Sequence, residues 1–423
     1  MTLDARLPGF GDVPVPVALE EPTRPVRRRW VAAMSFGNVA VYAAFFGPIQ
    51  VLLAQQSEAL APGNKEFAFG LVTGAGAVVS VVANPLFGAL SDRTTSRYGR
   101  RVPWVVGGAI AGAAGLLVLA GAEAVALMLV GWCLVQAACN ALLAALVAAV
   151  PDRVPHRQRG TVSGWVGLAQ TLGAMAGVAI ASVTGGFRTG FVACAAFLLV
   201  MVVPYVVGSQ DAALPRDRRP AFAWGAFLRS FWLDPRSYPD FGWAWLTRFL
   251  MNVGNALGTL YLLYYLQDAV HHPDPDTGVV VLTATYAVTM LLTVVVGGIA
   301  SDRVGRRKPF VLCAGLVMSV AALILAGAQT FTGAIIAATV LGLGFGVYAS
   351  VDFALLTEVL PKAVDRAKDL GVINIASTLP QVLAPAIAAP VVTHLGGYPV
   401  LYVISAVLGT AGAVLVYRIK AVR

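Results

Sequence analysis

Two ionisable residues, Arg248 and Asp352, lie inside long apolar runs of the sequence, where a charged side chain is costly and usually marks a working site. A carboxyl group in apolar surroundings favours its protonated form, whereas a neighbouring guanidinium favours the carboxylate. If Arg248 approached Asp352 in one conformation and withdrew in another, the carboxyl group would release and bind a proton. The two residues could instead form a permanent structural ion pair, and the sequence leaves both interpretations open.

A short charged phrase occurs twice, and each copy stands between two apolar runs. Each copy consists of an aspartate and an arginine, followed by a glycine and two further arginines. These residues are Asp92, Arg93, Gly99, Arg100 and Arg101 in the first copy, and Asp302, Arg303, Gly305, Arg306 and Arg307 in the second. Positive charge beside apolar runs sets the orientation of a membrane protein, but aspartate contributes little to orientation, so the repeated aspartate indicates another role.

We interpret the repeated phrase as a gate. Gly88 is expected to let the second and eleventh apolar runs approach closely, and Asp92 to stand at the start of the eleventh run, where a helix attracts negative charge. By symmetry, Asp302 is expected at the start of the fifth run, near Arg157 and Arg159. These charges would hold two halves of the molecule together in one state and release them in another. The simpler alternative is that they only fix topology and orient a short loop.

The elements that position these residues are expected to be membrane helices. The 423 residues are 58% hydrophobic and only 12% charged, with a mean hydropathy of +0.77, which is too little polar surface for a water-soluble globule. The apolar runs are continuous for about 20 residues or more, as a membrane helix requires, and do not alternate as membrane strands do. The sequence predicts an all-α fold with twelve spans, at about 30–55, 66–91, 103–121, 124–150, 158–182, 187–208, 240–267, 277–300, 309–328, 331–360, 366–393 and 396–418.

The distribution of positive charge predicts the topology. The net charge is +9, and almost all basic clusters fall on one side of a twelve-span threading, so retention on the cytoplasmic side explains them better than nucleic-acid binding. We expect a protein of the cytoplasmic membrane with both termini in the cytoplasm. Its expected segments are a disordered tail (1–29), an N-terminal half (30–208), a cytoplasmic linker (209–239) and a C-terminal half (240–423).

No cofactor, metal or enzymatic site is expected. The loops contain none of the common motifs for a catalytic nucleophile, a zinc ion or a bound phosphate. The four cysteines lie in apolar runs as small hydrophobic residues. His271 and His272 precede a Pro-Asp-Pro-Asp sequence that could hold a metal ion, although its composition favours a turn set by proline.

The chain resembles the major facilitator superfamily. The resemblance rests on the doubled Gly-x-x-Ser-Asp-Arg and Gly-Arg-Arg phrase between spans two and three and between spans eight and nine, and it covers nearly the whole chain. Residues 86–103 and 352–385 resemble the glycoside-pentoside-hexuronide carriers and the related sucrose/proton symporters. The resemblance implies two pseudo-symmetric halves of six helices, with spans one, four, seven and ten lining a central cavity, so that Arg248 and Asp352 lie on neighbouring walls.

Polar side chains on these spans would suit a hydroxylated solute, because amides bond to hydroxyl groups and aromatic faces pack on the C–H surface of a sugar ring. Any one of them could instead make a hydrogen bond between helices. The candidates are Asn38, Tyr42, Gln136, Asn140, Asn252, Asn255, Tyr261, Tyr348, Asn374 and Gln381.

We therefore expect a monomeric transporter, surrounded by membrane lipids, that moves a small polar solute such as a sugar or glycoside by proton-coupled alternating access. Sodium coupling is disfavoured because spans two and four lack the acidic residues that melibiose-type sodium symporters place there. Proton-driven export of a drug or secondary metabolite is the alternative within the fold, although span five lacks the Gly-Pro pair typical of exporters. A membrane scaffold or receptor is the alternative of a different class.

Overall fold

The computed structural model describes residues 22–209, 211, 213–215, 225, 238–359 and 366–420. For some helical residues in these ranges, among them Asp302, Asn374 and Gln381, the description is limited to the backbone. Six helical passes precede the linker region and six follow it. The first six are α1 (Arg28–Gly47) with η1 (Pro48–Leu52) and α2 (Leu53–Leu60), α3 (Lys65–Asp92), α4 (Val102–Ala120), α5 (Val125–Arg153), α6 (His156–Val183) and α7 (Phe187–Gly208).

The second six passes repeat this plan. They are α9 (Pro239–Leu260) with α10 (Leu262–Asp268), α11 (Pro275–Val304), α12 (Lys308–Gly327), α13 (Phe331–Val359), α14 (Arg366–His394), and α15 (Gly397–Leu415) with the short η3 (Val416–Arg418). All passes begin and end within a few residues of the predicted spans. Ten of the described helices are long and apolar enough to cross a membrane. The other two passes are the one divided into α9 and α10 at Tyr261, and α14, whose shorter apolar stretch is Leu383–His394.

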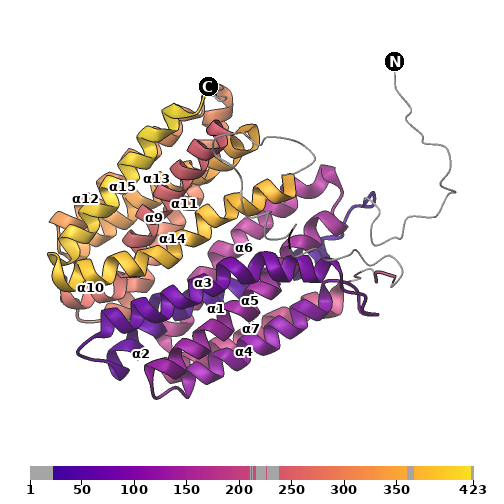
Figure 1. Ribbon diagram of the computed structural model, residues 1–423, viewed down its shortest axis with the longest axis horizontal. Coiled ribbons are helices and arrows are strands. Elements are labelled where there is room, and N and C mark those ends of the chain that lie inside the picture. Colours follow the sequence, from indigo (N-terminus) through magenta and orange to yellow (C-terminus); the bar gives the residue numbers. More distant parts are fainter. Residues whose placement is uncertain are drawn as a thin grey trace.

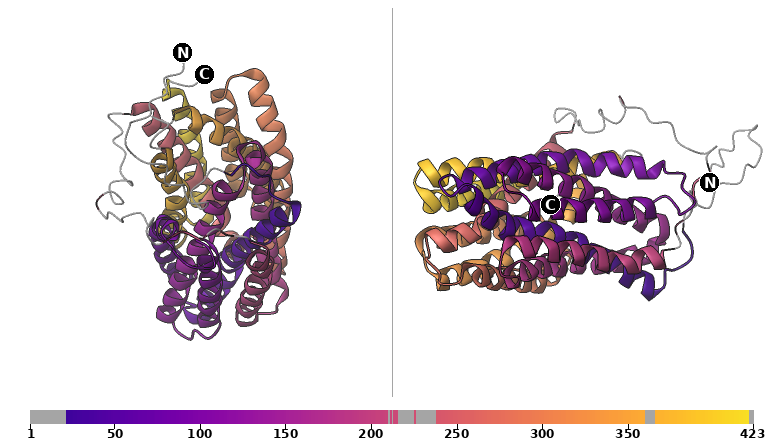
Figure 2. Two further views of the ribbon diagram at one scale, coloured as in Figure 1. Left: turned by 90° about the vertical axis from the view of Figure 1, so that its right-hand side faces the viewer. Right: turned by 90° about the horizontal axis from the view of Figure 1, so that it is seen from below.

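The helices form two bundles that lie side by side (Figures 1 and 2), one from each half of the chain. In the N-terminal bundle, α1 packs on α6 and α7, and α5 packs on α3 and α4. In the C-terminal bundle, α13 packs on α11 and α12, and α15 packs on α9 and α12. The two most extensive helix contacts between the bundles are those of α3 with α14 and of α6 with α11. The positions of α14 and α11 therefore depend on both bundles.

One close helix crossing holds α13, the helix that carries Asp352, against α11. A Cβ atom built on Gly346 of α13 would lie 2.4 Å from the carbonyl oxygen of Met290 and 2.1 Å from the hydroxyl oxygen of Thr293. The backbone oxygen cannot move aside without displacing α11. Small residues allow membrane helices to approach this closely. Because lipid leaves no hydrophobic driving force between helices, close packing and its dispersion contacts hold them together.

We expect Gly346→Ala to destabilise the protein, because the added methyl group forces α11 and α13 apart. Overpacking of this kind costs about 1–3 kcal/mol, which should lower the thermal unfolding midpoint of the purified protein in detergent. Gly107→Ala on α4 is the matched control, since a Cβ at that position meets nothing within 4 Å. Equal unfolding midpoints for the two variants would show that the crossing of α11 and α13 accommodates the added methyl group.

Candidate functional site

An ion pair joins the two halves at the end of the bundle that carries α2 and α10, here called the α2/α10 end (Figure 1). Lys65, at the start of α3, lies 2.9 Å from the carboxylate of Asp268 at the end of α10. Glu58 approaches the same ammonium group at 3.5 Å, and Tyr398 donates its hydroxyl hydrogen to the other oxygen of Asp268 at 2.9 Å. The pair is partly exposed, so it links the halves without sealing them alone.

Further hydrogen bonds between the halves lie at the same end. Gln55 of α2 donates to the carboxylate of Asp276 at 2.8 Å, and Ser182 of α6 donates to the backbone oxygen of Asp276 at 3.2 Å. Thr283 of α11 donates to Gln50 of η1 at 3.1 Å. These hydrogen bonds join the two halves at the α2/α10 end, which is closed in the structure.

Aromatic side chains fill the interior of the α2/α10 end. Phe69 of α3 meets the rings of Tyr261 and Tyr264 edge to face, with centroids 5.4 and 5.7 Å away. Tyr264 donates its hydroxyl hydrogen to the backbone oxygen of Ala54 in the other half at 2.9 Å. Tyr261, a predicted solute ligand, is only 1% exposed and donates to the oxygen of Pro385 at 3.5 Å. The structure thus assigns Tyr261 to the closure between the halves, where its ring packs against the opposite half.

Arg101 is the centre of a charge cluster at the other end of the molecule. It lies in the loop between α3 and α4 that carries the first copy of the repeated phrase, here called the first signature loop; the loop between α11 and α12 that carries the second copy is the second signature loop. Its guanidinium group is 2.6 Å from Asp92, 2.8 Å from Asp152 and 2.5 Å from the hydroxyl of Ser91. Arg100 adds a contact of 3.0 Å to Asp152. Burial alone would lower the pKa of Arg101, but its bonds to Asp152 and Asp92 outweigh burial and raise it, so the guanidinium stays charged. Sequence reasoning missed Asp152, although it follows a predicted span directly.

Among the described residues, the close approach of α3 to α14 lies at Gly70, where a Cβ would be 3.3 Å from the backbone oxygen of Pro385 on α14. The described neighbour of a Cβ on Gly88 is Ala144 of α5, at 4.0 Å, so the approach predicted there stays a prediction. The close approach at Gly70 lies near the α2/α10 end, which is closed. Asp92 contacts Arg101 of its own half, and because the side chains at the start of α14 lie outside the description, its predicted contact there stays a prediction.

The second signature loop, between α11 and α12, is more open than the first. Arg303, Gly305 and Arg306 are exposed, and Arg307 is half-buried. Gly305 ends α11 with a left-handed φ of 63° and donates to the backbone oxygen of Ser301. The side chain of Asp302 lies outside the described residues, as do those of its expected partners at the start of α6. Arg93 of the first loop is half-buried.

Arg248 and Asp352 form an ion pair inside the C-terminal bundle. Arg248 comes from α9 and Asp352 from α13, and the carboxylate side chain is only 7% exposed. The Nε of Arg248 also donates to the hydroxyl of Ser377 on α14, at 2.9 Å. The guanidinium group therefore connects three helices, one of which packs on the N-terminal half. Ser377 was not predicted, because a serine within an apolar run carries no distinctive signal.

Other side chains surround this pair. Asn252, one turn after Arg248, donates to the backbone oxygen of Arg248 at 2.8 Å. Tyr348, one turn before Asp352, has a buried hydroxyl near the carboxylate and makes no hydrogen bond of good geometry to a described group. Trp245 stacks on Phe249 with ring centroids 5.2 Å apart. The hydroxyl of Tyr348 thus lies close to the carboxylate of the pair, and the aromatic stack lies on the same helix as Arg248.

Two of the four solute candidates of the N-terminal half, Gln136 and Asn140, are hydrogen-bonded to each other. Asn140 donates to the backbone and side-chain oxygens of Gln136, at 2.8 and 3.2 Å, and accepts from Asn84 of α3 at 3.3 Å. The bond from Asn84 ties α3 to α5. Asn38 donates to a backbone oxygen one turn earlier, but its own side-chain oxygen is buried without a described partner. Tyr42, on the same helix, is partly exposed and lies among aromatic rings.

The remaining candidates are placed only in part. The side-chain oxygen of Asn255 on α9 is buried without a described partner. Asn374 and Gln381 lie on α14, but their side chains are outside the described residues. Three candidates therefore combine burial with a polar atom that lacks a described hydrogen bond, namely Asn38, Asn255 and Tyr348.

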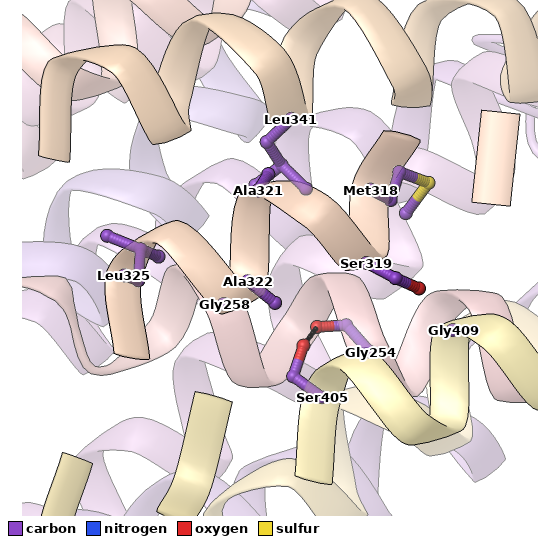
Figure 3. Close-up of a pocket in the computed structure, with 10 residues that line it drawn as sticks. All are labelled: Gly254, Gly258, Met318, Ser319, Ala321, Ala322, Leu325, Leu341, Ser405 and Gly409. Atoms are coloured by element: carbon purple, nitrogen blue, oxygen red, sulfur yellow. Dashed lines mark hydrogen bonds between the residues drawn. The ribbon is translucent and has the colours of Figure 1, made fainter. Parts of the chain in front are cut away.

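A small cavity within the C-terminal bundle is not a solute site (Figure 3). It measures about 10 Å³ and lies among α9, α12, α13 and α15. Small residues such as Gly254, Ala322 and Gly409 line it, and Ser405 donates to the backbone oxygen of Gly254 at 2.8 Å. Since about 10–15 Å³ is needed for one water molecule, the cavity is a packing gap between small residues.

Comparisons with known proteins identify the family. Residues 30–284 and 260–422 both match the family model described as the Major Facilitator Superfamily. Multidrug resistance protein MdtL of Shewanella oneidensis is 36% identical over 104 residues, which span 25% of this chain and 26% of that protein. The chain thus matches only about a quarter of that relative's length.

Solved structures of transporters share the fold. The nucleoside transporter NupG superposes with a TM-score of 0.73 at 12% identity, over 92% of this chain and 99% of that one. The human organic anion transporter MFSD10 gives a TM-score of 0.67 at 16% identity, over 93% and 100% of the two chains. Identities this low establish the fold alone. The chain belongs to the major facilitator superfamily, and it is a multi-pass membrane transporter with the twelve-helix fold of that family, not an enzyme.

Proposed function

We propose that the protein is a secondary transporter that couples the movement of a small polar solute to a proton, with Asp352 as the proton-binding group. The observation that carries this proposal is the ion pair of Arg248 and Asp352 inside the C-terminal bundle. An unpaired charge in such surroundings is strongly unfavourable. The carboxyl group is therefore either paired with Arg248 or protonated, and a conformational change that separates the two residues would be linked to proton uptake.

Coupling also requires that the proton site senses the arrangement of the halves. Arg248 binds Ser377 of α14 as well as Asp352, and α14 packs on α3 of the other half. When the contacts at the α2/α10 end break and the halves rock, α14 must move against the N-terminal bundle because it packs on α3. A shift of Ser377 would pull on the guanidinium group and weaken its hold on Asp352.

A neutral, hydroxylated solute such as a sugar or glycoside fits the described side chains best. Arg248 and Asp352 neutralise each other, so they offer no net charge to an anion or a cation. Asn38, Asn255 and Tyr348 each have a buried polar atom without a described partner, and a buried polar group without a partner costs about 1–3 kcal/mol. Hydroxyl groups of a solute could satisfy them.

Export of an amphiphilic drug is the second candidate, and the similarity to MdtL over a quarter of its length favours it. The stacked rings of Trp245 and Phe249, and of Tyr42 and Phe46, would suit an apolar solute. Expression in a drug-sensitive bacterial host separates the two functions. Sugar transport predicts uptake of radiolabelled sucrose or lactose with unchanged drug resistance, whereas drug export predicts raised resistance to ethidium and chloramphenicol without sugar uptake.

We expect Asp352→Asn to abolish proton-driven accumulation, because an amide cannot exchange a proton. Proteoliposomes with an imposed pH gradient and a radiolabelled panel of sugars and glycosides would measure this, and downhill exchange of the transported compound should persist. The substitution leaves Arg248 unpaired, so the double variant Arg248→Gln with Asp352→Asn tests the same point without a lone buried charge. Ser405→Ala, which alters another buried side chain that contacts α9, is the control. Accumulation by Asp352→Asn at the normal level would contradict the proposal.

We expect Lys65→Asp to open the α2/α10 end, because it places a carboxylate opposite Asp268. Partly exposed pairs contribute about 0.2–1 kcal/mol, so loss of the pair should lower the ratio of closed to open molecules by up to about fivefold, and the added repulsion should lower it further. Spin labels at the exposed positions Gly63 and Pro273, in a background without native cysteines, would report the distance between the halves. Adding Asp268→Lys restores opposite charges and should recover the closed population. No change in either variant would mean that the aromatic rings hold this end closed.

A further inference from the structure

A carboxylate from beyond the end of α7 caps the start of α4. Asp211 accepts hydrogen bonds from the backbone N–H groups of Arg101, at 2.5 Å, and Val102, at 3.1 Å. These groups belong to the first turn of α4, where N–H groups have no partner within the helix and negative charge is favourable. Arg101, which occupies the N-cap position, makes no side-chain cap of its own. The cap is therefore supplied by Asp211, which follows the last helix of the N-terminal half.

The first signature loop is shaped to admit this carboxylate. Gly99 has a φ of 96°, which L side chains rarely adopt, and a Cβ built on it would lie 2.3 Å from the carboxyl carbon of Asp211. Two independent features of Gly99, its backbone conformation and the space beside it, thus require glycine. Asp211 also lines a small cavity with Trp30, Asp152 and Tyr205, so its carboxylate lies among side chains of the N-terminal half.

Both the backbone and the side chain of Arg101 are held in place as a result. Its backbone N–H binds Asp211, while its guanidinium group binds Asp92, Asp152 and Ser91. The backbone bond limits where the side chain can reach, and Arg101 in turn holds Asp92, the aspartate of the repeated phrase. Removal of Asp211 would free the first turn of α4 and loosen all three contacts of the guanidinium group.

The second signature loop differs from the first in length and in the space beside its glycine. Only Val304 stands between Arg303 and Gly305, whereas residues 94–98 stand between Arg93 and Gly99. A Cβ on Gly305 would meet nothing within 4 Å. The longer first loop is thus the one that wraps around a carboxylate from outside it. The two copies of the repeat therefore differ in the length of the loop and in what lies beside its glycine.

We propose that Asp211 is a positioning residue for the conformational change of the transporter. It fastens the chain that follows α7 to the first signature loop, so that Asp211, Arg101 and Asp92 move as one piece. The proposal rests on the transporter fold and is independent of the solute and of proton coupling. It predicts that loss of Asp211 alters the distance between the two signature loops as well as the order of α4.

Two measurements on the full-length protein test the proposal. Hydrogen exchange would follow the amides at the start of α4, where loss of a cap corresponds to about a 2- to 30-fold faster exchange, from the usual cost of 0.5–2 kcal/mol. Spin labels at the exposed positions Arg97 and Val304 would report the distance between the two signature loops. For Asp211→Ala we expect both faster exchange and a changed distance distribution, and for Asp211→Asn a smaller change of each kind.

Matched variants separate positioning from a general loss of structure. Asp240→Asn removes another carboxylate that accepts from a backbone N–H, that of Lys420 at 2.9 Å in the other half, and should leave exchange in α4 unchanged. Gly99→Ala should act like Asp211→Ala, and the two together should change exchange by less than the product of the single effects. Unchanged exchange in Asp211→Ala would overturn the cap. Faster exchange with an unchanged distance distribution would reduce Asp211 to a local structural role and overturn the proposal.

Discussion

The constraint on which the structure most depends is that Arg248 and Asp352 must compensate each other inside an apolar bundle. Neither charge would be stable there alone, because lipid and apolar side chains cannot replace the water it has lost. Their pairing fixes the relative positions of α9 and α13, and the bond to Ser377 adds α14. Since α14 also packs on α3, this buried charge pair is linked to the boundary between the halves, where any rocking motion takes place.

The sequence predicts the twelve passes well, because a membrane helix must be long and continuously apolar, and both properties are visible in the residues. The interruptions inside passes are harder to foresee. Pro48 opens a π-helical segment in the first pass, and the seventh pass breaks at Tyr261. Proline within a membrane helix is often tolerated, and Tyr261 carries no signal for a break. These features depend on the side chains that pack beside them in the folded protein, and a single sequence does not reveal those neighbours.

The site was predictable where a residue type is out of place. Arg248 and Asp352 could be singled out because charge is rare within apolar runs, and the structure brings them together. Asp152 and Asp211 were missed because they lie at helix ends, where charged residues are ordinary, and their importance comes from their distance to Arg101. Tyr261 shows the converse difficulty, since the sequence does not distinguish a tyrosine of a solute site from one that packs in an aromatic closure.

The strengths of the contacts suggest why the halves can move as units. Within the N-terminal half, Arg101 is almost fully buried and binds three side chains at once, an arrangement that resists separation because each partner left behind would be an uncompensated polar group. Between the halves, the pair of Lys65 and Asp268 is partly exposed, and such pairs contribute about 1 kcal/mol or less. A two-state equilibrium needs a gap of only a few kcal/mol. Weak contacts between the halves keep the free-energy gap between closed and open states small. Strong contacts within each half keep the bundles intact when the α2/α10 end opens.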